Sequence, residues 1–297
     1  MGGRVGERAG TVRDRKMEIQ KLTGYMGAEV SGPDLKQPIS SDLADSLRLA
    51  LADHQMIVFR GQHLSIEDQK RLTLVFGALM RNPYVAALPG EPDVIAVQKK
   101  AEEVNTGVFG GDWHSDFSFL ENPPTGSVLN AVDVPAVGGD TVWSSQASAY
   151  DHLPAEVKQI VDGRDAIHIG KPYGVSHAPP MQGRANASMK MTRGDPQADR
   201  EVRHPAVVTN PLNGRKSLFV NPTYTTRFDG MSEEESETVL EAIYRHCTRP
   251  DFCCRLRWRN GDVAVWDNRM SMHYATNDYE GSNRLLYRTT FTTAPPA

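Results

Sequence analysis

Two stretches of this 297-residue chain decide its fold and chemistry: Gly111-Asp112-Trp113-His114-Ser115-Asp116-Phe117 and, far downstream, Trp266-Asp267-Asn268-Arg269-Met270-Ser271-Met272-His273. The first holds His114 and Asp116 two positions apart, and the second ends in His273. Two histidines and one carboxylate are the ligand set of a non-haem Fe(II) site, which leaves three octahedral positions open for a co-substrate and O2. On a β-strand over 113–119, His114 and Asp116 point to the same face. The pattern therefore predicts an iron site to which another strand contributes His273.

A strand expected at 284–292 carries Arg284 and Arg288 on one face, about 13 Å apart at the rise of a β-strand. A buried arginine without an anionic partner is costly, so an inward-facing pair predicts a bound anion such as a dicarboxylate co-substrate. The Gly138-Gly139 turn, which lies between the two halves of the predicted iron site, is followed closely by Thr141. The hydroxyl of Thr141 is placed to donate a hydrogen bond to the same carboxylate.

With these residues in place, the chain resembles the taurine dioxygenase and phenoxyacetate herbicide dioxygenase family of Fe(II)- and 2-oxoglutarate-dependent oxygenases. The resemblance runs in the family's order over roughly residues 17 to 292, and Arg284 and Arg288 follow His273 by the family's spacing. The blocks that carry it are Phe59-Arg60-Gly61-Gln62, Phe76-Gly77, Trp113-His114-Ser115-Asp116, Gly138-Gly139-Asp140-Thr141, Leu218-Phe219-Val220-Asn221, Trp266-Asp267-Asn268-Arg269, and His273 through Arg288.

The resemblance implies a role for each of these polar residues. The iron ligands would be His114, Asp116 and His273, and these are also the expected catalytic residues. Thr141 and Arg284 would bind the distal carboxylate of 2-oxoglutarate. Arg288 would hold an anionic group of the substrate. The implied reaction consumes O2, converts 2-oxoglutarate into succinate and CO2, and hydroxylates an unactivated C–H bond. When the hydroxylated carbon bears an ether oxygen, a sulfonate or an amine, the product breaks apart.

The expected substrate pocket departs from that of the taurine enzymes. Where they have a histidine before a proline, this chain has Asn82, and where they have an asparagine four residues before the first iron ligand, it has Gly110. These changes favour a bulkier and less polar small organic acid, either aryloxyalkanoate-like or sulfonate-like. An intermediate of a secondary-metabolite pathway, hydroxylated or desaturated, is the alternative. Further expected pocket residues are Tyr224, Tyr173 and Met189.

The same residues also allow interpretations without oxygenase activity. The chain has nine histidines, and a single buried histidine is more often a hydrogen-bonded core residue than a metal ligand. A cupin-like metal-binding protein without turnover needs only the three ligands, but it leaves the Arg284 and Thr141 anion site without a purpose. A zinc hydrolase is the other alternative, and it predicts activity with Zn(II) and no requirement for oxygen. Succinate release distinguishes the oxygenase from both.

Composition limits the remaining function classes. The formal net charge of −4 gives no electrostatic case for nucleic acid or a membrane surface, and no apolar run reaches the length of a membrane span. Three cysteines are too few for a disulfide framework and fit a reducing compartment, so we expect a cytoplasmic protein. The expected partner is a small-molecule substrate. The family resemblance leaves a homo-oligomer, either dimer or tetramer, open.

The chain divides into an extension and one domain. Residues 1–16 are rich in glycine and arginine and are expected to be disordered, and 17–297 form a single domain. Residues 170–203 have little periodicity and are expected to form a lid over the substrate. We expect a mainly β fold with flanking helices, a double-stranded β-helix or jelly roll, because many short strands follow one another between turns. Expected helices cover 41–54, 65–76, 148–162 and 232–246, and expected strands lie near 93–98, 113–119, 126–133, 140–144, 206–209, 216–220, 252–258, 262–266 and 284–292.

Overall fold

The computed structural model describes residues 16–176 and 187–293. The predicted disordered extension therefore lies almost wholly outside the described residues, as does the centre of the predicted lid. Within the described ranges, no helix has both the length and the apolar character needed to cross a membrane.

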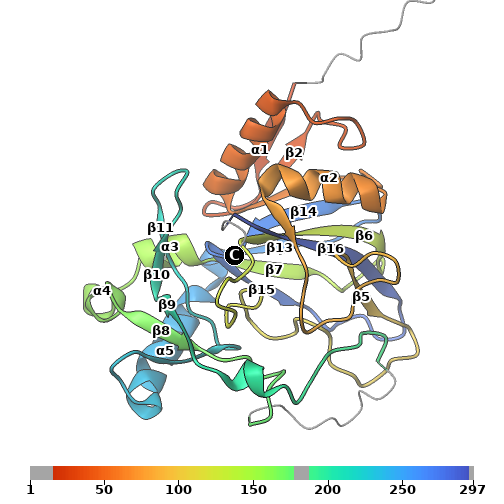
Figure 1. The fold of residues 1–297 in the computed structure, drawn as a ribbon. Coiled ribbons are helices and arrows are strands. Elements are labelled where there is room, and N and C mark those ends of the chain that lie inside the picture. Colours follow the sequence, from red (N-terminus) through yellow and green to blue (C-terminus); the bar gives the residue numbers. More distant parts are fainter. Residues whose placement is uncertain (1–15, 177–186, 294–297) are drawn as a thin grey trace, which may run out of the picture.

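The largest sheet has eight strands and forms one wall of the molecule (Figure 1). Its order is β1-β2-β3-β14-β6-β16-β4, and β5 also pairs with β16. All of its pairings are antiparallel except that of β2 with β3. The strands are β1 (Glu18–Lys21), β2 (Ala28–Ser31), β3 (Met56–Phe59), β4 (Ala78–Met80), β5 (Ile95–Lys99), β6 (Gly126–Asp133), β14 (Val263–Asp267) and β16 (Arg284–Thr292).

A second sheet completes the β core. It has the order β13-β7-β15, from β13 (Cys253–Leu256), β7 (Thr141–Ser145) and β15 (Ser271–Ala275). Trp143 on β7 and Trp266 on β14 are fully buried, and their rings meet edge to face with centroids 5.7 Å apart. One apolar cluster contains both tryptophans together with Leu129 of the large sheet and Leu256 of the small one. The two sheets therefore enclose a common core, as the predicted jelly roll requires.

Two helices cover the other face of the large sheet, α1 (Ser41–His54) and α2 (Ile66–Phe76). Leu47 of α1 and Leu72 of α2 are buried in one cluster with alternate residues of β3 and β14. Ser65 and Asp68 form the predicted capping box at the start of α2, which satisfies two otherwise unpaired backbone N–H groups. These helices close the core on that side and leave the opposite side of the large sheet for the site.

The remaining elements form a smaller layer beside the second sheet (Figure 1). Helix α5 (Glu233–Cys247) starts at the capping box predicted for Ser232 and Glu235. The helix expected at 148–162 is instead two helices, α3 (Gln146–Asp151) and α4 (Ala155–Val161), because Pro154 cannot donate an intrahelical hydrogen bond and begins a new helix. The other strands and 3₁₀ helices are β8 (Asp165–His168), η1 (Pro196–Asp199), β9 (Val202–Pro205), β10 (Val207–Thr209), β11 (Lys216–Leu218), β12 (Thr225–Phe228) and η2 (Pro250–Phe252).

The strand predicted at 113–119 is wrong. His114 forms a single β-bridge with His273, and the residues after it form a turn in which Phe117 has a φ of +46°. A left-handed residue ends strand geometry. The same-face rule for a strand is therefore not what brings His114 and Asp116 together.

Candidate metal centre

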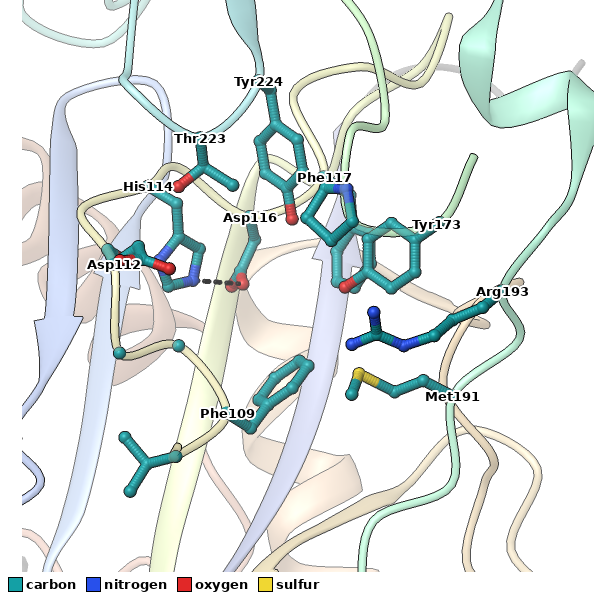
Figure 2. Close-up of a pocket in the computed structure, with 14 residues that line it drawn as sticks. Phe109, Asp112, His114, Asp116, Phe117, Tyr173, Met191, Arg193, Thr223 and Tyr224 are labelled. Atoms are coloured by element: carbon teal, nitrogen blue, oxygen red, sulfur yellow. Dashed lines mark hydrogen bonds and ion pairs between the residues drawn. The ribbon is translucent and has the colours of Figure 1, made fainter. Parts of the chain in front are cut away.

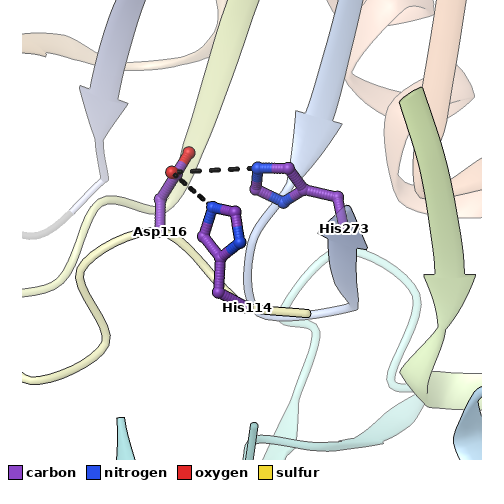
Figure 3. A group of neighbouring side chains, drawn as sticks. All are labelled: His114, Asp116 and His273. Carbon is purple, nitrogen blue, oxygen red and sulfur yellow. Dashed lines mark ion pairs between the residues drawn. The ribbon is translucent and has the colours of Figure 1, made fainter. Parts of the chain in front are cut away.

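Three side chains meet where His114 pairs with His273 in the middle of β15 (Figure 3). The backbones of His114 and His273 exchange two hydrogen bonds of 3.0 and 2.7 Å, which fixes the two residues side by side. Nε2 of His114 lies 3.6 Å from Oδ1 of Asp116, and Nε2 of His273 lies 3.9 Å from the same oxygen. One ligand atom from each residue falls within 4.8 Å of the others. All three residues are buried, with exposed fractions of 6%, 1% and 6% for His114, Asp116 and His273.

The carboxylate of Asp116 is held from both sides. Ser127 on β6 donates to Oδ2 at 2.7 Å, and Nη1 of Arg288 on β16 donates to Oδ1 at 2.9 Å. Burial alone would raise the pKa of Asp116, but the charge of Arg288, followed by His273 and His114, outweighs burial and lowers it well below its usual range. Asp116 is therefore ionised, as a metal ligand must be.

The histidines have the protonation that metal binding needs. Nδ1 of His114 lies 2.7 Å from the backbone carbonyl of Asp112, and a carbonyl only accepts, so this nitrogen carries the hydrogen and Nε2 keeps its lone pair. Burial, and then the neighbouring His114, lower the pKa of His273 well below its usual value, which keeps its ring neutral. Two imidazoles and a carboxylate, all buried and convergent, fit Fe(II) as a two-His-one-carboxylate ligand set.

A small cavity beside the triad has the character of an anion site. Arg284 is 4% exposed, and its Nε donates to the carbonyl of Gly139 at 2.9 Å. Oγ1 of Thr141 accepts a hydrogen bond from Nε1 of Trp258 at 3.0 Å, which leaves the hydroxyl hydrogen of Thr141 free to donate. Both predicted contacts of the 2-oxoglutarate carboxylate thus face one cavity. Its described lining is Val97, Phe109, Gly110, His114, Leu129, Thr141, Trp266, His273, Ala275, Arg284 and Arg288.

A larger cavity of about 110 Å³ opens on the other side of His114 and Asp116 (Figure 2). Part of its wall is aromatic, with the rings of Phe117, Tyr173 and Tyr224 on one side and Phe109 opposite (Figure 2). The remaining described lining residues are Val108, Gly110, Gly111, Asp112, His114, Asp116, Pro172, Met191, Arg193 and Thr223. The cavity therefore combines aromatic rings with charged side chains directly against two of the three candidate metal ligands.

Most of the predicted substrate residues gather at these cavities, but Asn82 does not. Tyr224 lines the larger cavity, and Gly110 lines both cavities. Arg288 lines the smaller cavity, with its guanidinium 5.3 Å from the ring of Phe109. Oδ1 of Asn82 instead accepts the backbone N–H groups of the two residues after Pro83, each at 2.9 Å, so Asn82 shapes a turn and lines neither cavity.

Several site residues were missed from the sequence. Ser127 could have been found as a polar residue on the inward face of an otherwise apolar strand. Phe109 and Arg193 lie in segments without periodicity, so the sequence carried no signal for them. Met189, expected in the pocket, packs against the core cluster, and its neighbour Met191 lines the cavity instead.

Three convergent metal ligands lie beside an arginine-lined site for an anion. This combination is typical of Fe(II) enzymes that take a 2-oxo acid as co-substrate. The sequence profile of the family described as "Taurine catabolism dioxygenase TauD, TfdA family" matches residues 18–290, and the chain belongs to this family.

Individual relatives agree over nearly the whole chain. The protein is 31% identical over 278 residues to an alkylsulfatase from Acinetobacter baylyi, with 93% of this chain and 85% of the relative covered. It is 30% identical over 277 residues to an alpha-ketoglutarate-dependent sulfate ester dioxygenase from Pseudomonas putida, with 93% and 89% covered. The crystal structure of a taurine dioxygenase from Burkholderia xenovorans superimposes with a TM-score of 0.77 at 30% identity and covers 95% of this chain and 92% of that one.

These findings confirm the predicted family, the jelly-roll fold and the enzyme class. The protein is a 2-oxoglutarate-dependent dioxygenase that acts on a small molecule, and its family implies Fe(II), 2-oxoglutarate and O2. The His-Asp-His triad that such an enzyme needs is present.

Proposed function

We propose that His114, Asp116 and His273 hold Fe(II), that Arg284 and Thr141 bind the distal carboxylate of 2-oxoglutarate, and that the larger cavity receives an organic sulfate ester. The observation that carries this proposal is the position of the triad between two cavities of different character. The smaller one contains Arg284, Arg288 and a free hydroxyl donor, and the larger one combines aromatic rings with the charged side chains of Asp112, Asp116 and Arg193. A charged co-substrate and a less polar substrate would thus meet the metal from different sides.

The chemistry divides between the metal and the chain. Bound Fe(II), with 2-oxoglutarate and O2, supplies the oxidising power that hydroxylates an unactivated C–H bond and yields succinate and CO2. The aromatic walls would exclude water and hold the alkyl part of the substrate against Asp116 and His114. Hydroxylation of the carbon that bears the sulfate gives an unstable hemiacetal-type sulfate. Its C–O bond breaks, the hydroxyl proton is lost, and an aldehyde and inorganic sulfate are released.

The sulfate ester class has two supports. Two relatives aligned over 93% of this chain are named an alkylsulfatase and a sulfate ester dioxygenase. In addition, Nε and Nη2 of Arg288 are buried without a partner among the described residues, and its guanidinium lies 5.3 and 5.5 Å from the rings of Phe109 and Phe117. Those rings line the larger cavity, so an anionic group entering beside Asp116 would meet Arg288. We therefore propose Arg288 as a contact of the substrate anion, together with Tyr224 and Gly110 as pocket walls.

The test begins without oxygen. The purified chain is titrated with Fe(II) and 2-oxoglutarate, and the weak visible charge-transfer band of the chelate is followed in the wild type and in Arg284→Ala. We expect a band that needs both ligands and that forms in Arg284→Ala only at much higher 2-oxoglutarate concentration. Iron binding without a band would refute the 2-oxoglutarate site and favour the metal-binding or hydrolase alternatives. An unchanged 2-oxoglutarate affinity in Arg284→Ala would refute the role of Arg284.

The substrate class is tested in air by succinate and sulfate release from hexyl sulfate. Phenoxyacetate, taurine and a set of secondary-metabolite acids serve as comparison substrates. We expect stoichiometric succinate and sulfate from hexyl sulfate. Succinate formation stimulated by phenoxyacetate or by another acid, but not by any alkyl sulfate, would keep the dioxygenase and overturn the sulfate ester assignment.

We also propose a reducing, cytoplasmic setting and a homo-oligomeric state. Cys247, Cys253 and Cys254 are free thiols, and burial raises the pKa of Cys253 and Cys254 to about 11, which keeps them unreactive. Labelling of the three thiols in freshly lysed cells, in denaturant that exposes them, tests the first proposal, and sedimentation of the purified chain tests the second.

A further inference from the structure

The segment from Lys190 to Arg193 forms part of the wall of the larger cavity. It runs beside residues 84–86, with Ala86 N–H donating to the carbonyl of Lys190 at 3.0 Å and Thr192 N–H donating to that of Tyr84 at 2.8 Å. Met191 forms a β-bridge with Val85 between these two bonds. Short β pairing of this kind holds the segment at a fixed distance from the cavity.

The pairing also decides which side chains face inward. In extended backbone, alternate residues share a face, so Met191 and Arg193 point the same way while Thr192 points away. Met191 and Arg193 are among the residues that line the cavity. Figure 2 shows the guanidinium of Arg193 directed into the cavity, beside Met191 and on the side opposite His114 and Asp112. Asp195 N–H donates to the carbonyl of Tyr173 at 3.0 Å, which fastens the far end of the segment to another wall residue.

The described lining of this cavity carries charges of both signs. Arg193 is its cationic residue, Asp112 and Asp116 are its acidic residues, and Asp116 is paired with Arg288 at 2.9 Å. Burial raises the pKa of Tyr173 to about 12, and Arg288, Asp116 and Arg193 all influence it. Tyr173 therefore lies within electrostatic reach of both arginines, and an anion bound beside Tyr173 would interact with both guanidiniums.

We propose that Arg193 is a specificity-determining residue that binds the anionic head of the substrate together with Arg288. This inference rests on the proposed function. A sulfate ester has three terminal oxygens, one more than a carboxylate, and the remaining N–H groups of Arg288 can satisfy only part of them. A guanidinium presents donors in a planar fork that matches such oxygens, and it does so from an ordered segment. Arg193 would thus favour sulfate esters over neutral molecules of the same shape.

The experiment compares Arg193→Gln with a matched control. Arg200→Gln removes the same charge from the same stretch of chain, but the Arg200 side chain is 67% exposed, lies 3.9 Å from Glu121 and does not line the cavity. Anaerobic enzyme loaded with Fe(II) and 2-oxoglutarate is titrated with hexyl sulfate by calorimetry, which measures binding without turnover. The affinity for 2-oxoglutarate is measured on each variant as a check that the fold and the smaller cavity are intact.

We expect Arg193→Gln to weaken hexyl sulfate binding about ten- to hundredfold, equivalent to about 1.4 to 2.8 kcal/mol, with 2-oxoglutarate affinity unchanged. Arg193→Lys should recover part of the loss, because it restores the charge without the fork, and Arg200→Gln should bind hexyl sulfate like the wild type. A merely structural role for Arg193 would lower 2-oxoglutarate affinity or thermal stability in parallel and would gain nothing from lysine.

The outcomes for Arg193 are separable from those for the proposed function. If the enzyme cannot be loaded with Fe(II) and 2-oxoglutarate, the proposed function fails, and the same titration on the metal-free chain still decides the role of Arg193. If hexyl sulfate binds and is not oxidised, the substrate assignment fails while the anion contact stands. Wild-type binding by Arg193→Gln, or no binding of hexyl sulfate to the wild type, overturns the inference.

Discussion

Gly110 is the position at which the packing around the metal centre can be tested most directly. It has a φ of +76°, and a Cβ added to it would lie 3.1 Å from Cε1 and 3.7 Å from Nε2 of His114. Gly110→Ala therefore combines two effects. Left-handed backbone costs a residue with a Cβ about 1 to 2 kcal/mol, partly offset by about 0.4 to 1 kcal/mol from the stiffer unfolded chain. The second effect is pressure on the imidazole that we propose binds iron.

Gly281 separates the two effects. Its φ is +74°, almost the same as that of Gly110, but a Cβ there would meet nothing within 4 Å. Gly281→Ala should therefore lose the same backbone contribution, about 1 kcal/mol of unfolding free energy, without touching His114. The difference between the two variants, in unfolding free energy and in Fe(II) affinity, therefore measures the effect of the contact with His114.

The assay has two parts, thermal unfolding of the metal-free chain and anaerobic Fe(II) titration with 2-oxoglutarate present. We expect Gly281→Ala to keep the Fe(II) affinity of the wild type. For Gly110→Ala we expect a loss of about tenfold to a hundredfold, the range seen when groups that orient metal ligands are changed. Equal Fe(II) affinities in the two variants would refute the claim that Gly110 is needed for His114 to keep its position.

Two further predictions concern groups behind the site. Trp258→Phe removes the indole N–H that donates to Oγ1 of Thr141 at 3.0 Å. The apparent KM for 2-oxoglutarate should then rise about two- to tenfold, which is the value of one neutral hydrogen bond. The control is Trp113→Phe, because the ring of Trp113 lines neither cavity, and equal KM values in both variants would contradict the role of Trp258. Burial lowers the pKa of His168 from 6.5 to about 3, so the unfolded chain takes up this proton at a higher pH than the native one, and stability is full above pH 6.5 and falls towards pH 3. The measurement is urea unfolding of the metal-free chain at pH 7.5 and pH 5. On acidification, the unfolding free energy of His168→Asn should fall by about 2 kcal/mol less than that of the wild type. An identical pH dependence in the two proteins would show that His168 is not the group that titrates.

The parts of the fold that follow from local pattern could be predicted from the sequence. The inward face of β16 was read from the spacing of Arg284 and Arg288, and both are buried as expected. The helix starts at Ser65 and Ser232 follow from a side chain that can cap the backbone and an acidic residue three positions later. In each case the deciding interaction lies within one or two turns of chain, so a single sequence contains it.

The parts that failed depend on contacts between distant segments. Trp113, Phe117 and Phe119 share one parity as on one face of a strand, yet Phe117 adopts a left-handed conformation and the chain turns. Phe117 is 1% exposed and stacks against Tyr173 at 5.7 Å, far away in sequence. Arg193 likewise reaches the cavity because its segment pairs with residues 84–86. Neither contact produces a pattern in the local sequence. The candidate ligand residues could therefore be chosen from the sequence, but the conformation of the backbone that carries them could not be predicted.

The shared wall between the two cavities links substrate and metal. Phe109, Gly110 and His114 line both cavities, so they form the partition between the aromatic volume and the arginine-lined one. The carbonyl of Gly110 accepts the N–H of Ala275 at 2.8 Å, and Ala275 lies two residues beyond His273 on the same strand. A substrate that presses on Phe109 therefore acts on a loop that touches one histidine of the triad and is bonded to the strand of the other. The backbone of Gly110 lies close enough to His114 that an added Cβ would be 3.1 Å from Cε1, so a displacement of this loop towards the triad would reach the imidazole. We expect substrate binding to alter the environment of the iron before any chemistry begins, and a shift of the chelate's visible band on anaerobic addition of hexyl sulfate would measure it.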